Sequence, residues 1–348
     1  SWLIAGVFLL TTVFPSQALA QGLLGLPAPG TPVLLSDSFM PAMLRGIRAY
    51  SDNPFQFDFI VDVGDSGLEG EAFNAEAQKL VRYFLASLTV PEKNLWVNLS
   101  PYEKERIIAG DFGETEMGRD LLAQDYLLKQ ITASLTHPES KTGRVFWDKV
   151  YKRSYELFGT TNIPANTFNK VWIVPAKAKV YENHDKAFIV ESKLKVMLEE
   201  DYVALQAKQQ VDSLSSAKPL QNTNDQMLTT KNSLSSQVAR EVLLPELEKE
   251  VNEGKNFAVL RQVYSSFILA AWFKQALKDS IINKKYSDQS KVKGVDVDDK
   301  DVHQKIYAQY LAAYKKGVCD IIKVEFDPYI RKAIPRKYFS GGIEMRTH

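Results

Sequence analysis

A Gly-Asp-Ser-Gly turn at residues 64–67 is the first feature of the sequence that could do chemistry. It follows the apolar stretch FDFIVDV and precedes a helix-like stretch, and serine hydrolases of two large families present their nucleophile on such a turn. The serine then needs a histidine as its base. In the trypsin-like order a histidine precedes the serine, but here all four histidines follow Ser66: His137, His184, His303 and His348. This order excludes the trypsin-like arrangement.

The turn looks more like the first block of the GDSL hydrolases, in which a later Asp-x-x-His supplies the base. No aspartate stands three positions before any of the four histidines, where the chain has Ser134, Tyr181, Lys300 and Met345. The Gly-x-Asn-Asp block of that family and a Gly-x-Ser-x-Gly elbow are also absent. Because glycine tolerates positive φ and Asp65 or Ser66 can bond neighbouring amides, the tetrapeptide also suits an ordinary turn. We therefore predict a turn and assign no catalytic residue.

Paired carboxylates are the second chemical possibility, since a glycosidase needs one acid and one base or nucleophile. The candidates lie between residues 103 and 120: Glu103, Glu105, Glu114, Glu116 and Asp120. Two of them flank a helix start, where acidic side chains are expected, and two alternate with Lys104 and Arg106 as on a solvated surface. A glycosidase-like envelope hydrolase that uses paired carboxylates is therefore the alternative function.

Metal and cofactor motifs are missing. The sequence has no His-Glu-x-x-His, no phosphate-binding loop and no dinucleotide fingerprint. In the acidic run DVDDKD, Asp296–Asp301, an EF-hand loop would need Gly at its sixth position and Glu at its twelfth, where Asp301 and Tyr307 stand. The run is better explained as N-capping of a following helix. We expect no metal and no cofactor.

Composition narrows the class of protein. The chain has 348 residues, of which 45% are apolar, and 43 basic side chains against 42 acidic ones. This balance argues against a nucleic-acid-binding protein, which concentrates Lys and Arg on one strongly basic face. The single cysteine, Cys319, permits no intramolecular disulfide, and we expect it as a small apolar residue on a C-terminal helix.

The first 20 residues have the layout of a secretory signal peptide. An apolar run from Trp2 to Phe14 is followed by Pro15 and by Ala18-Leu19-Ala20. The run is shorter than the roughly 20 residues of a membrane-spanning helix. We predict cleavage after Ala20, at a site formed by Ala18, Ala20 and Gln21, with an uncleaved anchor and a buried helix as alternatives. The mature chain would then be exported, periplasmic or secreted, without a transmembrane span.

The remaining sequence predicts an α+β protein that is mostly helical. Residues 21–54, rich in Pro and Gly, are expected to form an extended arm on the surface. An α+β body over 55–205 would contain a strand near 55–63, a helix over 71–88, helices that begin at Ser100 and Thr115, and a helix that ends at Gly159. Residues 168–202, interrupted by ENHDK, predict a β-hairpin or small antiparallel sheet.

The C-terminal third is predicted to be helical over residues 238–348. A polar stretch at 206–237, rich in Ser, Gln, Asn and Lys, separates it from the body. This stretch is either a linker between two parts or a long loop, in which case the C-terminal helices pack back on the β-hairpin.

Several dense stretches together resemble an uncharacterised family of exported bacterial proteins. They include NPFQFDFIVDVGDSGL, LWVNLSPYEKERII, TEMGRDLLAQDYLLKQ, GTTNIPANTFNKVWIVP, KAFIVESKLKVMLEEDY, NEGKNFAVLRQVYSSFILAAWFK and PRKYFSGG. The resemblance implies export and assigns no activity. With every catalytic template failing, the leading expectation is a non-enzymatic envelope or secreted protein that binds another envelope macromolecule or assembles with itself.

Overall fold

A computed structural model describes residues 26–27, 31–50, 56–89, 97–98, 115–163, 171–183, 185–214, 234–276 and 319–340. Its centre is a five-stranded antiparallel sheet in the order β2-β1-β5-β4-β3. The strands are β1 (Met43–Ala49), β2 (Phe57–Asp62), β3 (Val97–Asn98), β4 (Val171–Asn183) and β5 (Lys186–Leu198). The predicted α+β class, the strand near 55–63 and the hairpin within 168–202 are confirmed.

Helices make up most of the remaining described structure. They are α2 (Gly70–Thr89), α4 (Glu116–Leu135), α5 (Lys141–Phe158), α6 (Glu199–Leu214), α8 (Leu234–Val238), α9 (Leu244–Glu253) and α10 (Ala258–Ala276), with a π-helical turn at Ala239–Leu243 and a 3-10 turn at Lys255–Phe257. The predicted helix start at Thr115 and the predicted helix end at Gly159 are both present. The Thr115 side chain accepts a hydrogen bond from the Gly118 amide, and Gly159 adopts φ 66° at the end of α5.

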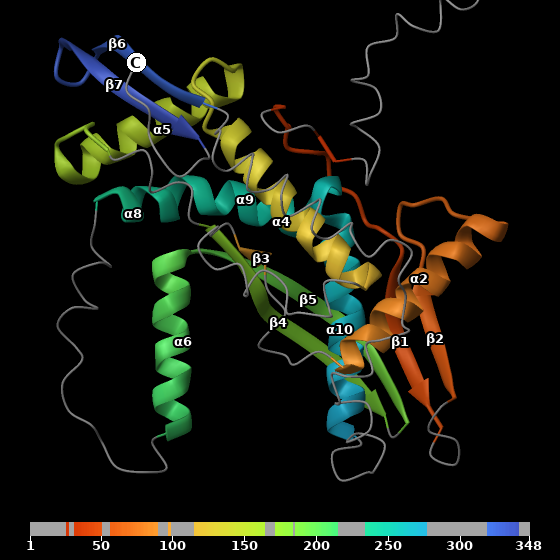
Figure 1. Cartoon of the computed structure of the whole chain (residues 1–348). Coiled ribbons are helices and arrows are strands. Elements are labelled where there is room, and N and C mark those ends of the chain that lie inside the picture. The colour runs from red at the N-terminus through yellow and green to blue at the C-terminus, as the bar shows by residue number, and fades with distance from the viewer. Residues whose placement is uncertain are drawn as a thin grey trace, which may run out of the picture.

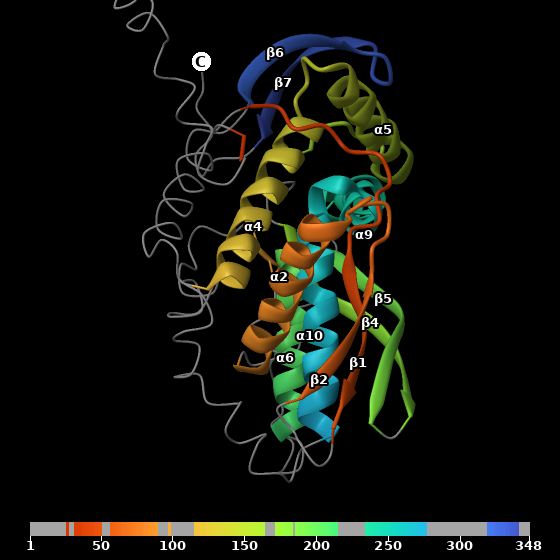
Figure 2. The same ribbon diagram turned by 90° about the vertical axis from the view of Figure 1, so that its right-hand side faces the viewer.

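Two helices cover one face of the sheet, which we call the inner face. Figure 2 shows α2 and α10 together on that side of β1, β2, β4 and β5. The buried side chains of the sheet on this side, such as Leu44, Ile47 and Ile189, join those of the two helices in one core. The rings of Phe57 and Phe84 meet edge to face at 5.4 Å between centroids and attach β2 to α2.

The predicted surface arm, residues 21–54, is wrong for its last part, because Met43–Ala49 forms β1 between β2 and β5. Leu44 and Ile47 are buried in the core. The sequence conceals this strand because a bulge between Leu44 and Gly46 interrupts the alternation of apolar and polar residues.

The described part of the arm before β1 is also attached to the body. The buried carboxylate of Glu250 in α9 accepts hydrogen bonds from the Ser36 amide and hydroxyl at 2.9 and 2.6 Å. The Arg261 guanidinium donates to the carbonyl oxygens of Phe39, Val251 and Gly254, and burial lowers the pKa of Arg261 to about 10. These bonds link a segment near the N-terminus to the junction of α9 and α10.

The prediction that residues 238–348 are entirely helical is also wrong. Cys319 lies on a strand, β6 (Cys319–Asp327), which pairs with β7 (Lys332–Ser340) in a separate two-stranded sheet. Figure 1 shows this hairpin beside α5 and away from the larger sheet. The stretch CDIIKVEFD alternates apolar and polar residues towards its end, which suits a strand. The preceding helix-like residues obscured this change of period.

The polar stretch at 206–237 is partly helical, because α6 extends to Leu214 and α8 begins at Leu234. Residues 215–233 lie outside the described residues. On either side of the stretch, one core joins residues from both predicted parts: α9 packs on β5, and α10 packs on β1 and β5. The arrangement is that of the second alternative, with C-terminal helices packed on the hairpin.

Candidate functional site

The turn that contains Ser66 is held by bonds within the fold. The Ser66 hydroxyl donates to the Val63 carbonyl oxygen at 2.6 Å. The Asp65 carboxylate accepts from the Met40 amide at 2.8 Å, and the Asp65 amide donates to the Met40 carbonyl oxygen at 2.7 Å. Gly64 has φ 52°, and a Cβ there would lie 2.3 Å from that same oxygen. These contacts are those of a turn that attaches the end of β2 to the arm.

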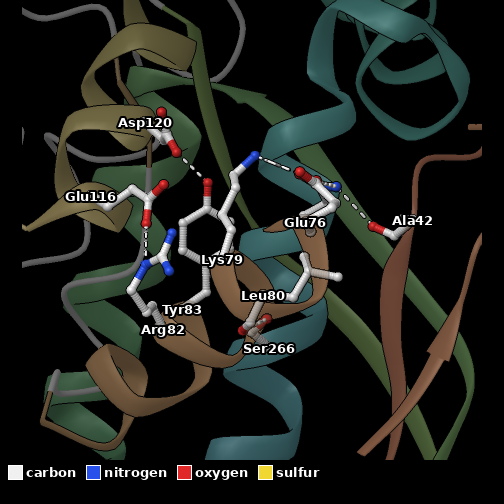
Figure 3. Close-up of polar contacts among 10 residues, drawn as sticks. Ala42, Glu76, Lys79, Leu80, Arg82, Tyr83, Glu116, Asp120 and Ser266 are labelled. Atoms are coloured by element: carbon white, nitrogen blue, oxygen red, sulfur yellow. Dashed lines mark hydrogen bonds and ion pairs between the residues drawn. The ribbon is translucent and has the colours of Figure 1, made fainter. Parts of the chain in front are cut away.

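The carboxylates named from the sequence fall into two groups. Glu103, Glu105 and Glu114 lie outside the described residues, whereas Glu116 and Asp120 lie one turn apart on α4. Figure 3 shows both side chains directed towards α2. Glu116 accepts a hydrogen bond from Arg82 Nε at 2.7 Å, and Asp120 accepts one from the Tyr83 hydroxyl. Each carboxylate therefore has its own partner on the neighbouring helix.

Burial changes the acid–base properties of Asp120 and of its partner Tyr83. Burial raises the pKa of Asp120, although the Tyr83 hydrogen bond acts in the opposite direction. The Tyr83 ring is fully buried, and its desolvation together with the charge of Asp120 raises the pKa of Tyr83 well above its usual range. A raised carboxyl pKa suits a general acid. Here, however, the Asp120 carboxylate already accepts a hydrogen bond from the hydroxyl of Tyr83, a tyrosine of the core.

A second set of polar contacts continues from α2 to α10. Gln262 Nε2 donates to the Ala42 carbonyl oxygen at 2.8 Å and to Glu76 Oε1 at 2.6 Å. Gln262 Oε1 accepts from Lys79 Nζ at 3.4 Å, and Lys79 also forms an ion pair with Glu76. We call the whole set the polar junction: Glu76, Lys79, Arg82, Tyr83, Glu116, Asp120 and Gln262. Its contacts join α2, α4, α10 and the residue before β1.

The opposite face of the sheet, which we call the outer face, presents apolar side chains to solvent. The strand register places Ile60, Gly46, Phe188 and Tyr181 in one row across β2, β1, β5 and β4. Ile60 is 55% exposed, Phe188 is 42% exposed and Tyr181 is 62% exposed. A Cβ at Gly46 would lie 3.0 Å from Ile60 Cδ1 and 3.3 Å from Phe188 Cδ2, so the glycine lets these two side chains approach each other.

Four lysines lie on the same face of the β4–β5 ribbon. Irregularities between Pro175 and Lys177 and near Val190 adjust the register so that the outward positions pair as Val174 with Lys195, Lys177 with Lys193, Lys179 with Glu191, and Tyr181 with Phe188. Two lysines are thus directly opposite each other, a pairing that lowers sheet stability. We call Lys177, Lys179, Lys193 and Lys195 the lysine face.

Two of these lysines have acidic partners. Lys177 Nζ lies 2.8 Å from Glu191 Oε2, and Lys193 Nζ lies 3.0 Å from Glu248 Oε1 of α9. The hydrogen bond and charge of Lys177 lower the pKa of Glu191, and Lys179 and Lys193 act in the same direction. Lys179 and Lys195 are exposed, and neither forms an ion pair among the described residues, although Lys179 lies directly opposite Glu191 in the ladder. The lysine face therefore has more positive than negative charge.

A groove of about 1020 Å³ continues from the lysine face to the base of the hairpin. One wall is α6, whose Tyr202 ring stacks on Trp172 with 3.8 Å between centroids, and the other is α9. Apolar residues from the sheet and both walls line it: Val174, Ala176, Met197, Leu205 and Leu244. Lys193, Lys195 and Lys249 also line it, among the acids Asp201, Glu248 and Glu253.

Beside this groove, the edge of β5 at Leu194 is hydrogen-bonded to a side chain of α9. Asn252 Oδ1 accepts from the Leu194 amide and Asn252 Nδ2 donates to the Leu194 carbonyl oxygen, each at 2.9 Å. Because this amide replaces a neighbouring strand, the wall formed by α9 has a fixed position relative to the lysines.

Most of the other sites named from the sequence fall where the structure gives no description. The predicted cleavage residues Ala18, Ala20 and Gln21, the acidic run Asp296–Asp301, and His184, His303 and His348 lie outside the described residues. His137 lies in the turn after α4, where its Nδ1 accepts from the Glu139 amide. The described part of the chain contains no group of three or more His, Cys, Asp or Glu side chains that could hold a metal ion.

None of the helices that the structure describes combines the length and apolarity required to cross a bilayer. Comparisons with known protein families, with curated proteins and with solved structures gave no match to this chain.

Sequence reasoning did not identify the lysine face. The signal was present as Lys-x-Lys in both strands of the predicted hairpin, at 177–179 and 193–195, because alternate residues of a strand point to one side. The strand register and the irregularities near residues 176 and 190 decide whether the two pairs share that side. The strand register and the positions of these irregularities could not be predicted from the sequence.

Proposed function

We propose that this chain is a bacterial protein exported to the envelope or the medium, of the exported family that it resembles, and that it binds another macromolecule through the outer face of its sheet. The observation that carries the proposal is the exposed row Ile60, Phe188 and Tyr181, which crosses four strands. Contiguous apolar side chains on a protein surface commonly form interaction sites. Aromatic residues are also enriched at protein interfaces.

The polar junction favours a binding protein over a carboxylate hydrolase. A glycosidase of the usual kind places two carboxyl groups on opposite sides of the bond that it cleaves. Glu116 and Asp120 lie on one helix, and each has a partner from α2. The carboxylates described here have the contacts of helix packing.

The test is affinity capture with the whole chain as bait from the native envelope fraction, followed by identification of what is retained. We expect Phe188→Ser together with Tyr181→Ser to remove the retained macromolecule. The matched control is Val145→Ser, an exposed apolar residue of α5 that lies outside the row. Equal capture by the wild type and the double variant would contradict the proposal.

Export has a separate test. Mass spectrometry of the protein recovered from its native host should give a mature N-terminus at Gln21, in the periplasmic fraction or the medium. Recovery from the cytoplasm with residues 1–20 retained would contradict export.

A further inference from the structure

We infer that the lysine face and the adjoining groove bind an acidic polypeptide segment that also carries apolar side chains. This inference rests on the proposed function and specifies its surface and partner. The arrangement of the lysines lowers the stability of the sheet. Lys177 and Lys193 occupy directly opposed positions in the ladder, and like charges in such positions destabilise a sheet.

The internal acids compensate only part of this charge. Glu191 and Glu248 form ion pairs with Lys177 and Lys193, and the other two lysines of the face have no such partner among the described residues. Lys195 also lines the groove, whose described lining has four basic side chains and three acidic ones: Lys193, Lys195, Arg240, Lys249, Asp201, Glu248 and Glu253. A negatively charged partner would supply the missing counter-charges, and charge complementarity of this kind favours encounter and fixes orientation.

The apolar surroundings indicate the class of partner. Phe188 and Tyr181 border the lysine face towards the hairpin tip, and Val174, Met197 and Leu205 line the groove at the other end. An anionic polymer without apolar groups would neutralise the lysines but leave these surfaces in water. A polypeptide segment with Asp or Glu beside aliphatic or aromatic residues matches both kinds of surface.

A second copy of this chain bound through the same face fits less well. A two-fold interface brings the same patch of each subunit together, so that both sides would carry the same excess of positive charge. Two surfaces with the same excess charge repel, and the acids Glu191 and Glu248 are already paired with lysines of their own copy. The charge pattern therefore favours a different polypeptide.

The decisive experiment is site-specific photo-cross-linking with the full chain in its native host. A benzophenone amino acid replaces Lys179 or Lys195 in one pair of variants, and Val145 or Val324 in a control pair, where both control side chains are exposed and lie on α5 and β6. We expect cross-links from position 179 or 195 to a peptide with net negative charge and apolar residues. We also expect Lys179→Glu with Lys195→Glu to reduce capture of that peptide at least tenfold.

The other outcomes separate this inference from the proposed function. Cross-links from the control positions alone would overturn the inference and leave macromolecular binding in place. Cross-links from none of the four positions, together with failed capture, would overturn both. Cross-links from the lysine face to a nucleic acid, a glycan, a lipid or a second copy of the chain would overturn the partner class.

The lysines could instead only protect the strand edges from pairing with other chains, and a separate experiment distinguishes this role from binding. Lysines and bulges on edge strands prevent pairing with other chains. If Lys179→Gln with Lys195→Gln causes self-association measured by light scattering while the acidic peptide is still captured at the wild-type level, the lysines protect the edge and the inference is wrong.

Discussion

The polar junction and the lysine face both contain several charged side chains, and they differ in where those charges find partners. In the junction, Glu116 meets Arg82, Asp120 meets Tyr83, and Glu76 meets Lys79 and Gln262, so the contacts join helices within the fold. On the lysine face, two of the four lysines form no ion pair among the described residues.

This difference separates a structural role from a binding role. Buried polar groups must be matched inside the protein, because leaving one of them unpaired costs stability. Exposed lysines are solvated without a partner and contribute little to stability. Substitutions in the junction should therefore change folding, whereas those on the lysine face should change binding alone.

The largest effect is expected for Gln262→Leu in the junction. The change leaves the Ala42 carbonyl oxygen without its Gln262 donor and removes the amide that Glu76 accepts from, so we expect the free energy of unfolding to fall by about 2–4 kcal/mol. Urea unfolding followed by circular dichroism measures this. The control, Lys179→Leu on the lysine face, should shift the free energy by less than about 0.5 kcal/mol. Equal losses in the two variants would break the comparison.

Tyr83→Phe should have a smaller effect, a loss of about 1–2 kcal/mol, because Asp120 loses a hydrogen bond while the ring stays in the core. The matched variant is Tyr181→Phe, which removes the hydroxyl of an exposed tyrosine on the outer face. We expect no measurable change in its unfolding midpoint. A loss in Tyr181→Phe as large as in Tyr83→Phe would show that the outer-face hydroxyl is also structural.

The two regions should respond to pH in opposite directions. Burial raises the pKa of Asp120 in the folded chain, so the folded state keeps this proton to a higher pH than the unfolded state does. Its contribution to stability is therefore lost as the pH rises above the ordinary carboxyl pKa of 3.8. Lys177 lowers the pKa of Glu191, so its contribution is present above the ordinary value and lost as the pH falls.

Thermal unfolding between about pH 3 and 7 measures both slopes. Asp120→Asn should gain midpoint temperature relative to the wild type as the pH rises, whereas Glu191→Gln should lose it. Salt should weaken the Glu191 effect more, because Glu191 is exposed. Differences of the same sign for both variants would contradict this account.

The smallest effect on stability is expected for Lys179→Gln with Lys195→Gln. Neither lysine forms an ion pair among the described residues, and removing two positive charges reduces repulsion on the face. The free energy of unfolding should stay within about 0.5 kcal/mol of the wild-type value or rise slightly. A loss above about 1.5 kcal/mol would place these lysines with the structural charges.

Local sequence signals predicted much of the fold. Thr115 is of a residue type that begins helices, and Gly159 is of the type that ends them. The alternation of Phe57 and Phe59 with polar residues indicates a strand. The β1 strand was missed because its bulge between Leu44 and Gly46 disrupts the alternation of apolar and polar residues. The strand at Cys319 was missed because a helix-like pattern runs directly into it.

The candidate site was harder to predict, because it depends on contacts between distant residues. The sequence identified Glu116 and Asp120 as carboxylates of interest, but their partners Arg82 and Tyr83 come from a helix more than thirty residues earlier in the chain. The lysine face likewise depends on strand register, and a slip of one residue would turn the lysines of one strand to the other side.

The most direct test of the central claim compares binding and stability in one pair of variants. The acidic polypeptide identified by cross-linking is titrated against the wild type, Lys179→Glu with Lys195→Glu, and the control Lys141→Glu with Lys152→Glu on α5. We predict at least tenfold weaker binding for the lysine-face variant alone, with an unfolding free energy within about 0.5 kcal/mol of the wild-type value. Unchanged affinity in that variant, or an equal loss in the α5 control, would contradict the claim.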